Sequence, residues 1–403
     1  MLLGTAHAVA ARREHASAPP SRAATSQPQP EARRLSILYV GPKNGTCRQR
    51  AEALRDLGHT VHHLRSGVSP LTSPVYPLHR IAHRIKRYPD LYFANSRLLS
   101  TARRNRFDVV WFDKGLAIRP RTLDRLRARL PKARIVAYSP DDMFNPLNQS
   151  RRYLDSIPRY DLHVTTKSYN VPELEAFGAR DVLFVDNAYH PALHRPMELT
   201  AEERRRFATD VGFVGTFERP RAEMIYRLAE AGVPVTVRGP GWRRFEKSHP
   251  LLTIRDEYLD AEDYPRAVNA TRINLAFLFK GNRDRQTTRS TEIPACRAFM
   301  LAERTDEHER LFREGREAEF FGSFEELLEK CRHYQARGEE RRNVAFAGYR
   351  RCVLEGYSNQ ARLGRVLDHL QSRPRRAPPE RTRPRGLSVL APRLLARSHA
   401  ASC

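Results

Sequence analysis

Cysteine is scarce in this chain of 403 residues, and the five that occur form no CxxC pair. This odd, dispersed set predicts neither a disulfide framework nor a structural zinc site, so we expect reduced thiols in a cytoplasmic protein. No apolar run approaches the roughly 18 to 20 residues that a membrane-spanning helix needs, and no signal-peptide-like core precedes the polar N-terminal stretch. The HExxH motif is missing, and His79 and His83 have no third ligand nearby. We therefore expect neither a metal ion nor another cofactor.

Lysine is also rare, because only 8 of the 71 basic residues are lysine. The formal net charge is +25, to which the first 34 residues contribute 5 Arg against 2 Glu and the last 33 contribute 8 Arg against 1 Glu. The remaining excess suits phosphorylated substrates, an anionic membrane surface or nucleic acid. No zinc finger, RNP-like string or basic stripe with interleaved aromatics occurs, so nucleic acid is not the expected partner. Peripheral contact with an anionic membrane stays open.

Apolar runs of strand length alternate with amphipathic segments, which predicts two Rossmann-like, doubly wound α/β domains. The alternation starts at residues 36–40, stops at the proline-bounded segment 190–196 and restarts at 210–217. We expect domains over 35–196 and 197–370, the second with C-terminal helices, between disordered tails at 1–34 and 371–403. The expected strands are 36–40, 59–64, 107–112, 134–139, 160–166, 182–187, 210–217, 233–239, 251–256 and 273–279. A helix is expected at about 78–104.

Polar residues follow these strands, where ligands bind in open α/β sheets. They include Asp186 with Asn187 and four of the eight lysines, namely Lys43, Lys114, Lys167 and Lys280. The loop 41–45 does not spell GxGxxG, which argues against a dinucleotide cofactor. Lys43 and Asn44 lie in this loop. Asp141 and Asp142 follow a later strand and could orient or deprotonate a sugar hydroxyl, although a simple turn explains them nearly as well.

The stretch 280–300 has the composition of a phosphate site. Lys280, Arg285 and Arg289 could supply charge, and a helix that starts within this stretch would direct its free N–H groups toward an anion. The hydroxyls of Thr287 and Thr288 can cap that helix. Glu292 follows in its first turns, and a carboxylate beside a phosphate site fits the vicinal hydroxyls of a ribose. The alternative is that Glu292 only favours its own helix terminus.

Six long strings of the sequence carry a family resemblance. They are YSPDDM (138–143), TTKSYNVPEL (165–174), VGFVGTFERPRAEMI (211–225), RGPGW (238–242), TTRSTEIPAC (287–296) and FMLAERTDEHERLF (299–312). Together they resemble the CgeB-like glycosyltransferases, a spore-maturation-type branch of the retaining GT-B enzymes (glycosyl transferases group 1-like), over about residues 35–370. The resemblance implies a GT-B fold, with two Rossmann-like domains facing each other across a cleft and the last helix crossing back onto the first domain. It implies that domain 35–196 lies on the acceptor side and domain 197–370 on the nucleotide-sugar donor side.

The resemblance also implies residue roles. In the broader retaining family, two glutamates separated by seven residues mark the donor site, the first near the transferred sugar and the second on the ribose. Glu292 stands at the second place, whereas the first holds the shorter Asp284, so Asn282 or a backbone amide is the alternative there. Arg221 matches a phosphate-facing arginine. Gly215 suits close approach of the donor, or equally strand–helix packing.

The sequence thus predicts a metal-independent glycosyltransferase of hexosyltransferase type, retaining by resemblance, that moves a sugar from a nucleotide-diphosphate donor to a saccharide or other acceptor. A sugar-nucleotide epimerase on the same fold is the first alternative, and a non-catalytic nucleotide-sugar or nucleic-acid binding protein is the second. The expected catalytic residues are Lys280, Arg289, Asp284 and Asp142; the expected donor-binding residues are Glu292, Arg285, Thr287, Thr288, Gly215 and Arg221; and the expected acceptor-side residues are Lys43, Asn44 and Asp141.

Overall fold

The computed structural model describes residues 33–67, 89–146 and 148–373. The described residues from Leu35 onward belong to one compact unit. Nearly all of both predicted tails, and the first part of a helix expected over 78–104, lie outside the described ranges. No helix in the described part of the chain is long and apolar enough to cross a membrane.

Six parallel strands form the first sheet: β1 (Ser36–Gly41), β2 (Thr60–Arg65), β3 (Val109–Asp113), β4 (Arg134–Ser139), β5 (Leu162–Thr165) and β6 (Val182–Phe184). Their order is β2-β1-β3-β4-β5-β6, so the direction of strand addition changes between β1 and β3. The strands are apolar runs because helices cover both faces of a parallel sheet. The helices of this half are α1 (Gly45–Asp56), α3 (Ala94–Arg104), α4 (Pro120–Arg129), α5 (Arg151–Ser156) and α6 (Asn170–Ala176).

The second sheet is also parallel, with the order β12-β11-β10-β7-β8-β9. Its strands are β7 (Thr209–Val214), β8 (Val235–Arg238), β9 (Leu252–Arg255), β10 (Thr271–Ala276), β11 (Met300–Glu303) and β12 (Glu319–Phe321). The order changes direction between β7 and β10, as in the Rossmann fold. Its helices are α7 (Ala201–Phe207), α8 (Arg219–Glu230), α9 (Asp263–Ala270), α10 (Arg289–Ala295), α11 (Asp306–Leu311), α12 (Phe324–Ala336), α13 (Gly338–Leu354) and α14 (Asn359–Ser372).

Each sheet has an apolar core on both faces. In the first half, α1 packs on one face and α3 and α4 on the other. In the second half, α8 and α12 cover one face and α9, α10 and α11 cover the other. Two doubly wound sheets in tandem are therefore present, as the sequence predicted, and the fold is GT-B.

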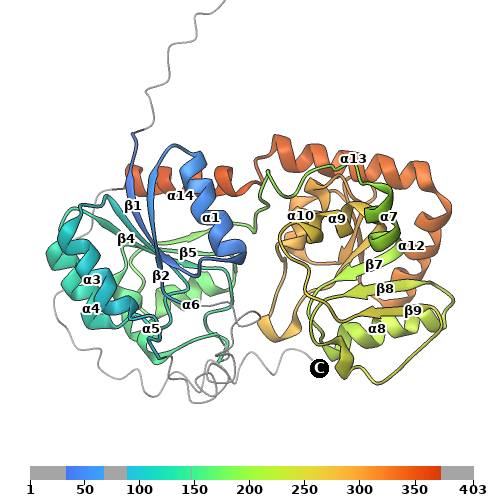
Figure 1. The fold of residues 1–403 in the computed structure, drawn as a ribbon, viewed down its shortest axis with the longest axis horizontal. Coiled ribbons are helices and arrows are strands. Elements are labelled where there is room, and N and C mark those ends of the chain that lie inside the picture. Colours follow the sequence, from blue (N-terminus) through green and yellow to red (C-terminus); the bar gives the residue numbers. More distant parts are fainter. Residues whose placement is uncertain (1–32, 68–88, 147, 374–403) are drawn as a thin grey trace, which may run out of the picture. The chain divides into compact units, whose positions relative to one another are not determined.

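The last helix, α14, follows the second sheet in the chain but packs against the first sheet. Its side chains Leu363, Val366, Leu367 and Leu370 are buried in the core of the first sheet together with residues of α1. Figure 1 shows α14 beside α1. This is the crossing that the resemblance implies for the last helix.

Strands β11 and β12 were not expected from the sequence. Both strands are short. Because only four residues separate the end of α10 from the start of β11, the apolar residues of β11 could not be distinguished in the sequence from the end of that helix. Parallel pairing of β11 with β10 and of β12 with β11 gives these residues their strand conformation. The four cysteines of the described residues, Cys47, Cys296, Cys331 and Cys352, are buried and unpaired, as expected.

Candidate functional site

The predicted donor residues come together where the second sheet changes direction. Gly215 and Arg221 follow β7, and residues 280–292 follow β10, which is its neighbour. In doubly wound sheets, the carboxyl ends of the two strands at this switch point form the usual ligand site. The two segments that carry the predicted donor residues are thus neighbours through strand pairing, although about 65 residues of sequence separate them.

The guanidinium groups of Arg221 and Arg289 both lie against the ring of Phe213, at 5.3 and 5.5 Å from its centroid. Among the described residues, the buried Nε atoms of both arginines have no hydrogen-bond partner. The only carboxylate of the described residues at ion-pair distance from either is that of Glu218, 3.4 Å from Nη2 of Arg221. Two nearby guanidiniums with unused buried donors form a suitable site for an anion.

Burial is the main influence on the charge of Arg221. Together with the positive charge of Arg289, it lowers the pKa of Arg221 to about 10. Removal from water disfavours the charged form of a guanidinium, and a second guanidinium nearby disfavours it further. A bound anion would offset both the lost hydration of Arg221 and its repulsion from Arg289, so both effects favour anion binding here.

Lys280 and Arg285, the other two predicted phosphate ligands, pair with carboxylates of their own domain. The ammonium of Lys280 pairs with Glu303, whose Oε1 also accepts the N–H of Leu278 at 2.9 Å. Nη1 of Arg285 is 2.9 Å from Oδ2 of Asp306, and both of these side chains are well exposed. Exposed cations that are already paired with carboxylates contribute much less to the binding of an anion than the two arginines that lie against Phe213.

Glu292 is only 6 % exposed, in the middle of α10. No arginine or lysine of the described residues lies within ion-pair distance of its carboxylate. The imidazole of His194 does, with its Nε2 at 3.7 Å from Oε1 of Glu292. Burial and the negative charge of Glu292 raise the pKa of Tyr264, so this neighbouring phenol stays protonated. A carboxylate that only favoured its own helix terminus would be exposed to solvent. The burial of Glu292 therefore fits a ligand-binding role better.

The expected threonine cap of α10 is wrong. Thr288 has φ −60° and ψ −34°, which are helical values, and its side chain makes no capping hydrogen bond. Because it is already part of the turn, its hydroxyl does not face the free N–H groups. Instead, the hydroxyl of Ser290 accepts the N–H of Thr287 at 3.0 Å. As donor ligands, Thr287 and Thr288 remain predictions.

Gly215 is required by packing. A Cβ at Gly215 would come within 2.6 Å of the Phe213 ring, and one at Gly239 would come within 2.1 Å of the Gly215 carbonyl oxygen. Gly239 also has φ +146°, and the same carbonyl oxygen accepts the indole N–H of Trp242 at 2.8 Å. The RGPGW segment therefore lies directly on the turn after β7, which favours the packing alternative for Gly215.

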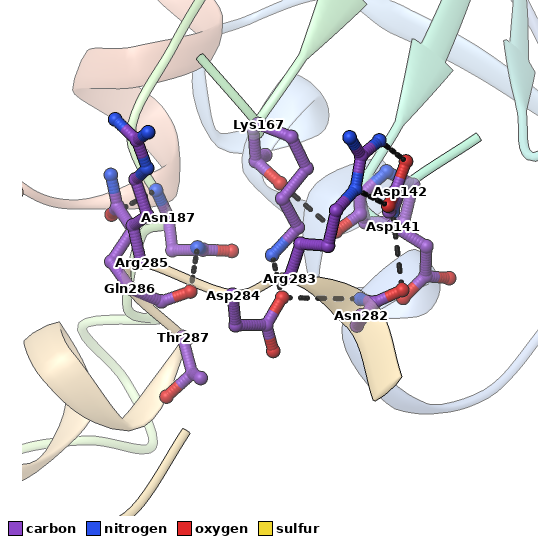
Figure 2. A network of polar contacts seen from close by, with 12 residues as sticks. Asp141, Asp142, Lys167, Asn187, Asn282, Arg283, Asp284, Arg285, Gln286 and Thr287 are labelled. Carbon is purple, nitrogen blue, oxygen red and sulfur yellow. Dashed lines mark hydrogen bonds and ion pairs between the residues drawn. The ribbon is translucent and has the colours of Figure 1, made fainter. Parts of the chain in front are cut away.

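Polar side chains of the first half hold the loop that follows β10 (Figure 2). Arg283, with φ +47°, donates from Nε and Nη2 to the two carboxylate oxygens of Asp142 at 2.6 and 2.8 Å. The buried Asp142 carboxylate also accepts from Nδ2 of Asn170 at 2.9 Å and from the N–H of Phe144 at 3.1 Å. With four donors on it, Asp142 can act as a general base only if Arg283 moves away.

Asp284 lies on the same loop and faces Lys167, a residue that sequence reasoning noted only as a strand-end lysine. Nζ of Lys167 is 2.5 Å from Oδ1 of Asp284, and Nδ2 of Asn282 donates to the same oxygen at 3.1 Å. Burial raises the pKa of Asp284, and the charge of Lys167 opposes the shift. Asn282 and Asp284, the two candidates for the sugar-facing place, are thus hydrogen-bonded to each other.

Gln286 is the residue of this loop that sequence reasoning missed. It is completely buried; its Oε1 accepts the N–H of Asn187 at 3.1 Å, and its Nε2 donates to Asp186 and to Glu307, each at 2.8 Å. Asp186 and Asn187 stood out as polar residues after a strand. Gln286 gave no signal because an uncharged amide in a polar loop looks solvated.

The acceptor-side residues lie at the carboxyl end of the first sheet. Lys43 is exposed in the loop after β1, and Asn44 immediately precedes α1. Asp141 pairs with Lys114; although burial opposes ionisation, the charge of Lys114 keeps the pKa of Asp141 below its usual range. Asp141 is therefore a carboxylate at neutral pH, and its role toward an acceptor stays a prediction.

Part of the chain matches a known protein family. Residues 219–368, less than half of the chain, match a protein-family model described as "Glycosyl transferase-like". No curated protein matches the chain. The matched segment begins at α8 and includes Arg221, Arg289 and Glu292.

Solved structures resemble the chain over most of its length. Anabaena HepE in complex with UDP and glucose has a TM-score of 0.56 at 11 % identity, covering 84 % of this chain and 100 % of that one. A glycosyltransferase from Rickettsia africae has a TM-score of 0.58 at 12 % identity, covering 84 % and 98 %. A protein described as a UDP-N-acetylglucosamine 2-epimerase from Listeria monocytogenes has a TM-score of 0.51 at 12 % identity, covering 87 % and 100 %. At such identities the likeness establishes the GT-B fold.

Proposed function

We propose that this protein is a glycosyltransferase that uses a nucleotide-diphosphate sugar as donor. The observation that carries the proposal is the pair Arg221 and Arg289, stacked on Phe213 with unused buried Nε donors where the second sheet changes direction. A diphosphate offers several charged acceptor oxygens to such a pair. The match of residues 219–368 to a glycosyl-transferase-like model supports the same assignment.

Fixed cations at the diphosphate would also accelerate the transfer. As the bond between the sugar and the diphosphate breaks, negative charge grows on the departing oxygen, so a preorganised guanidinium binds the transition state more strongly than the bound donor. The two arginines supply this charge as side chains, and we propose that the reaction is metal-independent. Glu292 would accept hydrogen bonds from the ribose hydroxyls of the same donor.

The remaining features of the proposal come from the resemblance rather than from contacts. They are a hexosyl donor, retention of configuration and a CgeB-like relationship. A cytoplasmic location is proposed from the dispersed cysteines, and peripheral contact with anionic membranes from the basic charge. Asp284 would lie nearest the transferred sugar. Asp141 and Lys43 would face a saccharide or other acceptor, and Asp142 would join them once Arg283 releases it.

Two measurements test the function. Nucleotide sugars are first screened for those that raise the melting temperature of the protein, because a ligand that binds only the folded state stabilises it. The best donor is then incubated with a panel of sugar acceptors. Formation of a glycosylated acceptor supports a transferase, whereas a donor that changes configuration without any acceptor would show the epimerase instead. If no nucleotide sugar stabilises the protein, the proposal is wrong.

A further inference from the structure

We propose that His194 is a positioning residue for Glu292, to which it presents the proton on Nε2 so that the carboxylate is held ready to accept the hydroxyls of a ribose. The inference rests on the proposed function, because it takes Glu292 as the ribose-binding group. It concerns the segment 190–196, which the sequence marked only as a proline-bounded linker.

His194 lies beside Glu292 in a buried environment. The imidazole is 3 % exposed and lies edge-on to the ring of Tyr264, with 5.8 Å between ring centroids. Its Nε2 is 3.7 Å from Oε1 of Glu292. Upstream of it, Tyr189 is anchored to the chain that returns through α14, because its carbonyl oxygen accepts the N–H of Asn359 at 2.8 Å.

The hydrogen bond on the other side of the ring determines where the proton is. The backbone N–H of His190 points at Nδ1 of His194, at 3.0 Å, so Nδ1 is an acceptor and carries no proton. Burial, only partly offset by the charge of Glu292, lowers the pKa of His194, so the ring is neutral at pH 7. A neutral imidazole with an unprotonated Nδ1 carries its proton on Nε2, the atom that faces Glu292.

A buried carboxylate loses its hydration and needs donors in exchange. Arginine and lysine provide none here among the described residues. The neutral donors beside Glu292 are the phenol of Tyr264 and the N–H at Nε2 of His194, and neither neutralises the carboxylate. A neutral donor suits this role, since a cation in ion-pair contact would compete with a ligand hydroxyl for the same oxygens. At 3.7 Å the contact is longer than a hydrogen bond, so it acts on Glu292 electrostatically and leaves the lone pairs of the carboxylate available to a ligand.

Two conservative variants separate positioning from simple packing. His194→Gln places an amide N–H near the position of Nε2 and keeps a donor toward Glu292. His194→Asn places an amide oxygen near Nδ1, which keeps the hydrogen bond from His190 but removes that donor. The probes are UDP, or ADP or GDP if one of these binds wild type more tightly, and inorganic pyrophosphate, which has the phosphates but no ribose. Dissociation constants are measured by calorimetry, with melting temperatures as the folding control.

We expect His194→Asn to weaken binding of the nucleoside diphosphate roughly tenfold and to leave pyrophosphate within twofold of wild type, because the loss concerns the ribose alone. His194→Gln should remain close to wild type. In the Glu292→Gln background, His194→Asn should add nothing, since the group it orients is gone. If both variants bind like wild type, or if both lose nucleotide and pyrophosphate equally, His194 does not position Glu292.

The tautomer provides a readout that does not depend on the ligand. In long-range ¹⁵N–¹H spectra of protein with labelled histidine, the His194 signals, assigned with the Asn variant, should show a neutral ring protonated at Nε2 and should shift in Glu292→Gln. A proton on Nδ1, or a doubly protonated ring at pH 7, would overturn the inference. If the spectra are as expected but wild type binds no nucleoside diphosphate, then the proposed function has failed and the local contact is confirmed without a ribose role.

Discussion

Replacing Arg289 with alanine should weaken binding of the nucleoside diphosphate much more than replacing Lys280. Arg289 stacks on Phe213 with an unused buried Nε, so its donors are available to a phosphate without first breaking an ion pair. Loss of a hydrogen bond to a charged partner costs about 1.5 to 3 kcal/mol, or roughly a 10- to 150-fold rise in the dissociation constant. Lys280 is 57 % exposed and paired with Glu303, and exposed pairs contribute about 0 to 1 kcal/mol.

Turnover should separate the two residues further. Removing one preorganised donor at the site of developing charge typically costs about 10² to 10³ in rate, so Arg289→Ala should lower turnover by this factor. The assay is release of the nucleoside diphosphate under saturating donor, with calorimetry for affinity and thermal unfolding to confirm folding. Arg151→Ala, an exposed position in α5, is the control. If Arg289→Ala matches this control while Lys280→Ala is severely impaired, the phosphates bind on the Lys280 side and the reasoning is refuted.

Three further predictions concern Glu292, the metal and the loop after β10. Glu292→Gln should raise the nucleoside diphosphate dissociation constant about tenfold, because an amide presents one weaker acceptor where a carboxylate presents two, and a change within twofold in calorimetry would contradict the ribose role. Donor turnover should survive EDTA; a complete loss restored by Mg²⁺ would show that the arginines are not sufficient. Arg283→Met should lower the melting temperature by several degrees, because the buried Asp142 loses two of its four hydrogen-bond donors. We expect the loss to cost about 2 kcal/mol of folding free energy, after a reduction for the 42 % exposure of the arginine side chain. The matched variant Arg285→Met loses an exposed ion pair and a cation–π contact 5.9 Å from the ring of Tyr169, and it should be nearly neutral. Equal shifts for the two variants would disprove the role given to the loop contact.

The sequence alone determined the two α/β halves and all ten of the strands expected of them. Buried parallel strands are nearly continuous apolar runs, so each strand is a local signal that does not depend on its neighbours. Strands β11 and β12 escaped because they are short and owe their conformation to pairing with β10 and with each other. The residue types of the donor site were also readable, since Arg221, Arg289 and Glu292 belong to contiguous strings.

Which of the predicted cations are available to a ligand was decided only by tertiary structure. In the sequence, Lys280, Arg285 and Arg289 are equivalent basic residues of one loop, and nothing local distinguishes them. Glu303 and Asp306, which neutralise the first two, come from the next strand and helix. Phe213, against which Arg289 and Arg221 stack, comes from the neighbouring strand β7. Ionic pairing depends on distances of a few ångströms between distant parts of the chain, which no spacing in the sequence encodes.

The contacts of the loop after β10 belong to the same class. The sequence indicated Asp142 and Asp284 as free carboxylates, whereas folding brings Arg283 onto the first and Lys167 onto the second. Likewise, the histidine of a proline-bounded linker becomes a neighbour of Glu292 only because the linker folds against α10. Local sequence sets what each side chain can do, and the three-dimensional arrangement of its partners sets whether it is free to do it.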